Sequence, residues 1–237
     1  MYCDPRGGHN RKNINENFFK IWSPKMAYVL GLILADGTIE DVRKSSRTCY
    51  LAFTSIDKSL IKQVKKTLSS VHNIYRRKPR TQTFSDGKSY HCAETFILRV
   101  GNKRMFQDLI NLGVIPRKSL RLKLPMVPNQ FFNYFLRGYF DGDGCVSVYQ
   151  KQKRVTKRIQ VIFTCGSPQF LKELSSKIDR LISIGGGAIF SNSRAFKLSY
   201  KKMASLELLS FMYKRLDKAP YLARKYNTYQ SFLHHNS

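Results

Sequence analysis

The sequence has few acidic residues. Asp and Glu together number 15 against 42 Lys and Arg, which gives a formal net charge of +27 and a pI near 10.1. Such an imbalance destabilises a free folded chain by self-repulsion and favours a polyanionic partner. Nucleic acid is the leading candidate, because each phosphate neutralised by Lys or Arg releases a bound counterion. A ribosome-associated protein, or one that is merely basic, has the same composition, so that alternative stays open.

The sequence also lacks cysteine pairs and long apolar runs. Its five cysteines are odd in number and none follows another at C-x-x-C spacing, which indicates neither a zinc finger nor a disulfide framework. The longest apolar run, Met26 to Ala35, is shorter than the roughly 20 residues that span a bilayer. The N-terminal segment carries Asp4 and Glu16 and has no apolar signal core. We therefore expect an intracellular protein, in a bacterial cytoplasm or an organelle.

One apolar helical segment occurs twice in the chain. The first copy runs from Ser23 to Gly37, with Ser23 suited to the N-cap, Pro24 to the first turn and Gly37 to the end of the helix. The second copy runs from residue 133 to 144 and aligns with the first without gaps. Asp36 thereby falls on Asp143, 107 residues further along the chain.

The rest of the chain follows the same repeat. Residues 53–55 match 163–165, and two helix-period apolar stripes lie 110 residues apart. The stripes are Leu60, Ile61, Val64 and Leu68 in one half and Phe170, Leu171, Leu174 and Ile178 in the other. Strands rich in β-branched and aromatic residues separate the helices. The pattern predicts an α+β fold of two pseudo-symmetric αββαββα halves with antiparallel sheets, residues 1–124 and 125–237, joined near two prolines at 125 and 128.

The repeated helices carry small residues four positions apart, Gly31 with Ala35 and Gly138 with Gly142. This spacing places both on one face and lets two helix backbones approach closely. A tightly packed helix pair alone would explain it, but each copy also ends in an aspartate, where a carboxylate opposes the helix dipole. If the helices pair in parallel, Asp36 and Asp143 face each other. Two such carboxylates indicate a divalent cation, and oxygen ligands without nearby His or Cys suit Mg²⁺.

The two segments, residues 31–37 and 138–144, resemble two copies of the LAGLIDADG signature of homing endonucleases, and the resemblance extends over roughly residues 20–233. It implies saddle-shaped sheets that follow the major groove, with the paired motif helices at the interface of a monomer. It also implies that Asp36 and Asp143 bind the metal, with Ala35 and Gly142 completing the site, and that each scissile phosphate is attacked by a metal-activated water. Leu34 stands where the second copy has Asp141, a position that is not the usual metal ligand in the family.

The resemblance further implies a basic residue near each cutting centre. Lys118 and Lys225 fit this role, because each follows an arginine and they lie 107 residues apart. Ordinary phosphate-contacting lysines would explain them almost as well. Ser55 and Cys165 occupy the position, after the first hairpin of each half, where a polar residue helps to place water, although cysteine is unusual there.

Basic hairpins in each half are expected to bind DNA. A two-stranded ribbon fits the major groove, where Arg pairs with guanine and Gln with adenine, although several contacts would be to phosphates only. The predicted DNA-binding residues are Arg43, Lys44, Arg47, Arg76, Arg77, Lys78, Arg80 and Gln82 in the first half and Tyr149, Lys151, Lys153, Arg154, Lys157, Arg158 and Gln160 in the second.

The sequence therefore predicts a Mg²⁺-dependent DNA endonuclease that makes a double-strand break with short 3′ overhangs in a long asymmetric target. Two alternatives stay open. An RNA maturase would bind the RNA of a host intron, with or without cleavage of DNA. A DNA-binding regulator on the same scaffold would have lost its catalytic acids, but both Asp36 and Asp143 are present.

Overall fold

A computed structural model describes residues 12–46, 48–83, 87–116, 120–150, 157–185, 187–192 and 195–234. The first half contains α1 (Pro24–Ala35), β1 (Gly37–Asp41), α2 (Arg43–Ser46), β2 (Cys49–Ser55), α3 (Lys58–Thr67), β3 (Ile74–Arg77), β4 (Arg80–Thr83), β5 (Ser89–Cys92), β6 (Thr95–Gly101) and α4 (Lys103–Asn111). The second half contains η2 (Asn129–Phe131), α5 (Phe132–Asp143), β7 (Gly144–Gln150), β8 (Lys157–Cys165), α6 (Pro168–Ile182), β9 (Ala188–Asn192), β10 (Ala195–Lys201), α7 (Met203–Tyr213), η3 (Leu216–Lys218) and α8 (Ala223–His234).

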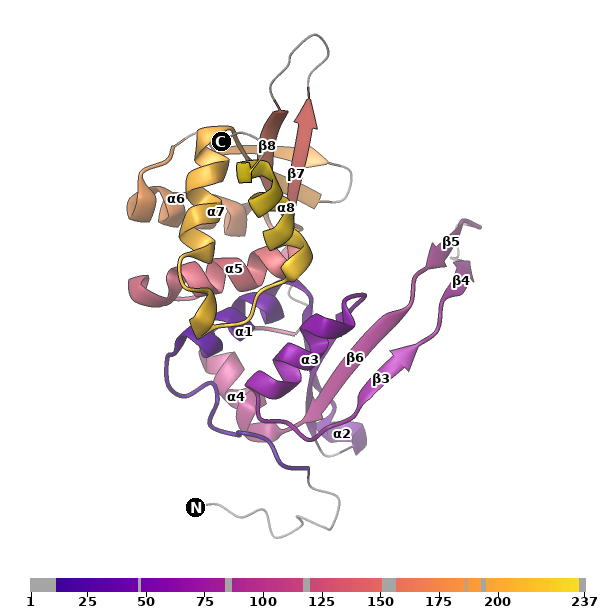
Figure 1. Ribbon diagram of the computed structural model, residues 1–237. Coiled ribbons are helices and arrows are strands. Elements are labelled where there is room, and N and C mark those ends of the chain that lie inside the picture. Colours follow the sequence, from indigo (N-terminus) through magenta and orange to yellow (C-terminus); the bar gives the residue numbers. More distant parts are fainter. Residues whose placement is uncertain are drawn as a thin grey trace.

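The two halves have the same sheet topology. The strand order is β1-β2-β6-β3 in one sheet and β7-β8-β10-β9 in the other, and neighbouring strands are antiparallel. Figure 1 shows α1 and α5 at the centre, between one half below and the other above, with β7 and β8 extending toward the top and the β4–β5 ribbon toward the right. The predicted αββαββα repeat is confirmed. The first half adds a short β4–β5 ribbon to the β3–β6 hairpin, and the second half adds α8.

The motif helices begin in different ways. In α1 the Ser23 hydroxyl accepts a hydrogen bond from the Met26 N–H at 3.1 Å, and Pro24 occupies the first turn, as the sequence predicts. Helix α5 has no side-chain cap and continues directly from η2. Gly37 does not end α1 through a left-handed conformation, because it is the first residue of β1. A Cβ there would lie 2.6 Å from the Cα of Ile33, so the glycine is required by space.

Helices α1 and α5 pack in parallel through main-chain contacts. A Cβ on Gly31 would lie 2.1 Å from the carbonyl oxygen of Phe135, and one on Gly138 would lie 1.9 Å from that of Tyr28. At the C-terminal ends, a Cβ on Gly142 would lie 2.4 Å from that of Ala35. No side chain larger than hydrogen fits at Gly31 or Gly138, so these glycines allow the helix axes to approach to backbone contact.

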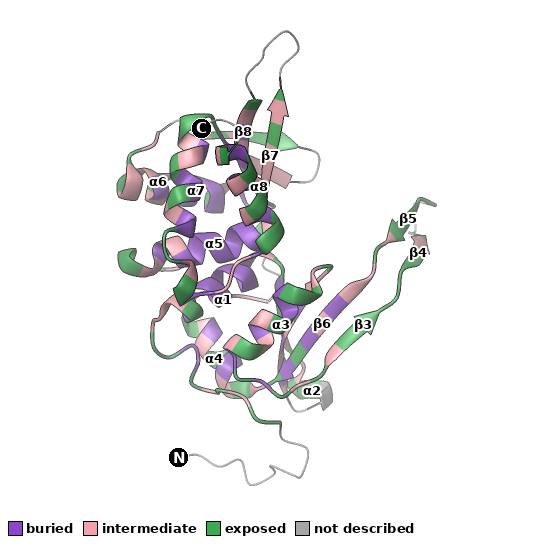
Figure 2. Cartoon of the chain, viewed as in Figure 1, coloured by how far each residue is buried: buried purple, intermediate pink, exposed green. Residues whose placement is uncertain are grey.

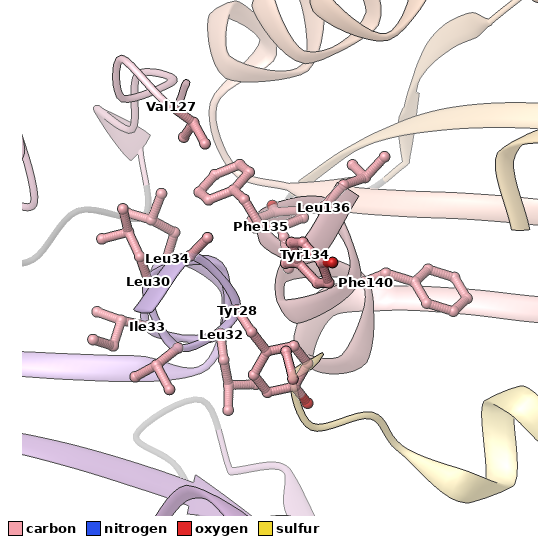
Figure 3. Packing of buried hydrophobic residues seen from close by; sticks show 14 of the residues in the cluster. Tyr28, Leu30, Leu32, Ile33, Leu34, Val127, Tyr134, Phe135, Leu136 and Phe140 are labelled. Carbon is pink, nitrogen blue, oxygen red and sulfur yellow. The ribbon is translucent and has the colours of Figure 1, made fainter. Parts of the chain in front are cut away.

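A single hydrophobic core extends across both halves. It includes the two predicted stripes on α3 and α6, and all eight stripe residues are at most 1% exposed. Figure 2 shows the burial concentrated in α1 and α5, while the outer surfaces of the peripheral helices are exposed. In Figure 3 Leu30 and Leu34 of α1 lie toward Val127, and Tyr28 and Leu32 lie on the opposite side, toward the yellow segment that precedes α8. The interface between the halves is thus the centre of the core.

Among the described residues, no helix is long and apolar enough to cross a membrane.

Candidate active centre and nucleic-acid interface

Asp36 and Asp143 lie together at the C-terminal ends of the paired helices. Asp36 is the C-cap residue of α1 and Asp143 is the last residue of α5. A Cβ on Gly142 would lie 3.3 Å from Oδ2 of Asp36, so the Asp36 carboxylate extends over the last turn of the partner helix. Asp36 is exposed and Asp143 is half-buried. The parallel helices therefore bring the two predicted carboxylates, one from each half, to one end of the interface.

The electrostatic environment of Tyr139 shows the same convergence. Burial raises the pKa of this tyrosine well above its ordinary value, and interactions with Cys165, Asp143 and Asp36 raise it further. Its hydroxyl donates a hydrogen bond of 2.8 Å to the carbonyl oxygen of Thr164. The carboxylates from both halves thus act on one phenol, which stays neutral and ties α5 to the end of β8.

Lys225 reaches this centre from α8, and its side chain is buried, with 4% exposed. The ammonium donates to the carbonyl oxygens of Phe140 at 2.5 Å, Asp141 at 3.0 Å and Gly144 at 2.6 Å. Burial lowers its pKa to about 8, although the charges of Asp141 and Asp36 favour the protonated form. Lys225 is therefore a cation bound to the C-terminal end of α5, where it neutralises the negative end of the helix dipole beside Asp143. Its predicted counterpart, Lys118, lies outside the described residues.

Asp141 forms part of a buried polar cluster that the first half lacks. Its Oδ2 accepts hydrogen bonds from the Tyr28 hydroxyl at 2.8 Å and from the Leu222 N–H at 2.9 Å. One turn earlier, Arg137 is fully buried and donates to the carbonyl oxygens of residues 212 and 219. Burial raises the pKa of Asp141 to about 6, and the Tyr28 hydrogen bond opposes that rise. The additional aspartate of the second motif therefore fixes the segment between α7 and α8 to the interface.

Ser55 and Cys165 occupy equivalent positions at the ends of β2 and β8. The Ser55 hydroxyl accepts the N–H of Asp57 at 3.1 Å, and the Cys165 sulfur accepts the N–H of Ser167 at 3.4 Å. Each residue thereby fixes the turn into the next helix. Their predicted role in placing water stays a prediction.

The donor atoms at the centre suit a hard cation. Two carboxylates lie at the ends of the paired helices. In the described parts of the chain, no group of three or more His, Cys, Asp or Glu residues could hold a metal ion. Two carboxylates leave most coordination positions to water and substrate oxygens, which is how Mg²⁺ usually binds in phosphate-processing sites.

The first sheet has an open face away from its helices. Residues that share this face line a groove of about 790 Å³. They alternate with buried residues along each strand, as the antiparallel register requires. The strand residues of this groove are Thr38, Glu40, Tyr50, Ala52, Thr54, Tyr75, Arg77, Ile97, Arg99 and Gly101.

The register places some predicted DNA-binding residues on this face and others elsewhere. Arg77 lines the groove, whereas Arg76 pairs across to the buried Phe96 and forms an ion pair with Glu94. Arg43 lies outside the groove and forms an ion pair with Asp41. Lys44, Lys78, Arg80 and Gln82 lie on α2 and along the β3–β4 arm, and all but the half-buried Gln82 are exposed.

In the second sheet, the predicted DNA-binding residues of the β7–β8 hairpin lie on two opposite faces, because successive side chains of a strand alternate between faces. Tyr149 pairs with Arg158, and Gln160 follows two residues later on the same face. Lys157 pairs with Gln150 on the opposite face, so the hairpin does not present all of its Gln, Lys and Arg residues together. Arg47, Lys151, Lys153 and Arg154 lie outside the described residues.

Several residues of the open faces were missed by reasoning from the sequence. Arg99, on the third strand of the first sheet, and Lys197 and Lys201, on the third strand of the second, share the faces of the predicted residues. Tyr75 and Phe190 occupy equivalent positions on the edge strands and are 56% and 44% exposed. The alternation of side chains along a strand could have identified them. Once the buried residues of β6 and β10 are recognised, the residues between them must lie on the open face.

Two family models match the chain, one in each half. The model for a LAGLIDADG-like domain matches residues 23–111, and the model for a LAGLIDADG endonuclease matches residues 136–235. The first match includes all of α1 and the second begins within α5, and each includes the ββαββα elements that follow the motif helix. The fold and the paired motif helices define a two-domain LAGLIDADG protein. The chain belongs to the LAGLIDADG family in its single-chain form.

Solved structures have the same fold at low sequence identity. The I-LtrWI LAGLIDADG homing endonuclease bound to target DNA is 16% identical with a TM-score of 0.51, covering 92% of this chain and 89% of that one. The meganuclease I-AabMI bound to uncleaved DNA is 14% identical with a TM-score of 0.53, covering 90% of each chain. Meganuclease I-SmaMI bound to DNA is 11% identical with a TM-score of 0.55, covering 88% of each chain. Comparison with curated protein sequences gave no match.

Proposed function

We propose that this protein is a site-specific DNA endonuclease that hydrolyses one phosphodiester bond in each strand of a long asymmetric target, leaving short 3′ overhangs. The observation that carries the proposal is the meeting of Asp36 and Asp143, one from each half, at the same end of two parallel helices. Family membership and the structural similarity to endonucleases crystallised with DNA support it. Because both halves are in one chain, the protein would act as a monomer.

Asp36 and Asp143, with the carbonyl groups of Ala35 and Gly142, would hold Mg²⁺. When bound, the cation neutralises charge that develops on the scissile phosphate. Lys225 holds the end of α5 in place and offsets the dipole that would otherwise disfavour an ionised Asp143. Lys118 would have the corresponding role in the first half.

The open faces of the two sheets would bind the DNA on either side of this centre. Arg77 and Arg99 in one half, and Arg158, Lys197 and Lys201 in the other, supply positive charge on these faces. The two faces differ in sequence, so the target would be only pseudo-palindromic. The large net charge of +27 supports a polyanionic partner of this kind.

The test begins with selection of bound and cleaved sequences from a randomised double-stranded DNA pool. The selected site is then incubated with wild-type protein, Asp36→Asn and Asp143→Asn, in Mg²⁺ and in EDTA. We expect the wild type to cut only with Mg²⁺, and each variant to lose at least about 100-fold in the rate of double-strand cutting. Binding in gel shifts should change little, and one variant could nick a single strand.

Asp217→Asn is the matched control, because Asp217 is an exposed aspartate in η3 whose charge is balanced by Lys218 and Arg215. It should cut at the wild-type rate. Wild-type cutting by Asp36→Asn or Asp143→Asn would overturn the assignment of the metal ligands. A wild-type protein that binds the selected DNA and never cuts it would instead be a regulator, and selective binding of structured RNA would indicate a maturase.

A further inference from the structure

The two sheets hold different side-chain pairs at equivalent positions of their open faces. The equivalence follows from strand register: Gly37 pairs with Phe53 in the first sheet as Gly144 pairs with Phe163 in the second. Counting from these anchors, Glu40 and Tyr50 correspond to Ser147 and Gln160. The third strands continue the match, because Phe53 pairs with Leu98 as Phe163 pairs with Leu198. Arg99 therefore corresponds to Ser199.

In the first sheet this position is charged and rigid. The Arg99 guanidinium lies 3.7 Å from the centre of the Tyr50 ring, and its Nη2 donates to Oε2 of Glu40 at 3.0 Å. The side chains of Arg99 and Glu40 are 44% and 45% exposed. The ring and the carboxylate hold the guanidinium over Tyr50, and the partly exposed side chain has further N–H donors besides the one bonded to Glu40.

In the second sheet the equivalent position is neutral. The Nε2 of Gln160 donates a hydrogen bond of 2.7 Å to the hydroxyl of Ser199, which is buried with 2% exposed. This hydrogen bond uses one of the two amide N–H groups and holds the carboxamide against β10. The other N–H and Oε1 remain as one donor and one acceptor side by side.

We propose that these two positions read different bases at symmetry-related places in the target: Arg99 reads guanine in the half-site of the first sheet, and Gln160 reads adenine in the half-site of the second. This inference rests on the proposed function. A guanidinium donates twice to O6 and N7 of guanine, whereas a carboxamide donates to N7 and accepts from N6 of adenine. Glu40 and Tyr50 are positioning residues for Arg99. Ser199 has the same role for Gln160. They orient the two base-contacting side chains before DNA binds.

Base reading and phosphate binding by Arg99 place different demands on its side chain. A lysine retains the charge of Arg99, but it cannot stack flat on Tyr50 or form a planar fork with guanine. If Arg99 only bound a phosphate, Arg99→Lys would keep both the affinity and the sequence preference. If it reads guanine, the preference at one base pair should weaken although the charge is unchanged.

The experiment measures sequence preference by binding, so it does not depend on catalysis. Wild type, Arg99→Met, Arg99→Lys and Gln160→Met are each used to select from a double-stranded pool randomised across the site, and the recovered sequences are counted. We expect the wild type to require guanine at one position and adenine at its symmetry mate. Each substitution should reduce discrimination at its own base pair by about tenfold or more and leave the other half-site unchanged.

Arg215→Met is the matched control, because Arg215 is an exposed arginine outside both sheets whose charge is balanced by Asp217. It should leave the base preferences unchanged. Uniform weakening on all sequences by Arg99→Met, with the preferences retained, would overturn the inference while leaving the proposed function intact. If the wild type selects no sequence at all, the proposed function fails and the inference fails with it.

Discussion

The hydroxyl of Tyr28 in the first half donates a hydrogen bond of 2.8 Å to the carboxylate of Asp141 in the second. The equivalent pair on the other side of the pseudo-two-fold axis, Phe135 and Leu34, is apolar. The interface between the halves is therefore symmetric in its glycine contacts and asymmetric in its buried polar groups. Removing one partner from a buried polar pair leaves the other unsatisfied, so this bond specifies how the halves combine.

Protonation of Asp141 should make folding stability depend on pH. Its pKa is raised to about 6 in the folded protein from an ordinary value of 3.8, so the folded state binds a proton that the unfolded state releases between these values. The contribution of this group to stability is therefore largest below about pH 4 and is lost as the pH rises through about 6, a difference of about 3 kcal/mol.

The measurement is the free energy of unfolding in urea between about pH 4 and pH 7 for wild type and Asp141→Asn. The difference between the two proteins cancels the titration of other carboxylates. We expect the wild type to lose stability relative to the variant as the pH rises. Two curves that stay parallel over this range would show that Asp141 does not titrate there.

Lys225→Met should show whether Lys225 stabilises the end of α5 from a buried position or contacts a DNA phosphate. The substitution removes the donor to three main-chain carbonyl oxygens at the end of α5, so we expect a loss of about 2 kcal/mol or more in folding stability. The single-turnover rate of cutting on saturated DNA should fall further than the affinity does. Because the ammonium is buried, the slope of log affinity against log salt should not change. A slope smaller by about one would identify Lys225 as a phosphate contact.

Gly138→Ala should separate the paired helices. The added methyl group would lie 1.9 Å from the main-chain oxygen of Tyr28, which cannot move without shifting α1. We expect destabilisation of about 3 kcal/mol or more in thermal or urea unfolding, with loss of cutting. Gly101→Ala is the control, because its methyl would meet side-chain atoms alone, of which the nearest is at the edge of the Tyr50 ring at 3.2 Å. Equal stability of the two variants would contradict the close packing of α1 against α5.

DNA binding should depend steeply on salt. A protein that makes some 6–10 phosphate contacts loses about 10³–10⁵ in affinity between about 50 and 200 mM salt. The charge of this chain is sufficient for such a number of contacts. Fluorescence anisotropy over a salt series measures the slope directly, and a nearly flat plot would mean that the positive charge serves another purpose.

The repeat made most of the architecture predictable. Two motifs in register predicted the two halves, the parallel helix pair and the position of Asp36 and Asp143, because helix and strand periods are local properties of the sequence. The cap at Ser23 was predicted for the same reason.

The open faces were harder to predict, because they depend on pairing between distant strands. Arg99 can be recognised as a residue of the open face only when β6 is known to lie between β2 and β3. That strand order brings Arg99 beside Tyr50 and Glu40. A shift of one residue in register moves a side chain to the other face, which is why Arg76 and Lys157 fell on the opposite side from Arg77 and Arg158.

The burial of Lys225 could not be predicted from the sequence either. Its pattern, a lysine after an arginine, is typical of an exposed basic segment, and only the packing of α8 against β7 encloses it. A lysine can be buried where main-chain oxygens accept hydrogen bonds from all of its N–H groups. Three carbonyl groups accept such bonds from Lys225.

The contacts of Gly31 and Gly138 have a consequence for how such an enzyme could acquire new targets. They join main-chain atoms, so the separation of Asp36 from Asp143 depends on the backbone of the two helices and on no side chain of either sheet. The stagger between the two cuts would then stay constant while the residues of the open faces diverge. Recognition and cleavage geometry could evolve independently, and each sheet could be redesigned for a new half-site without retuning the chemistry.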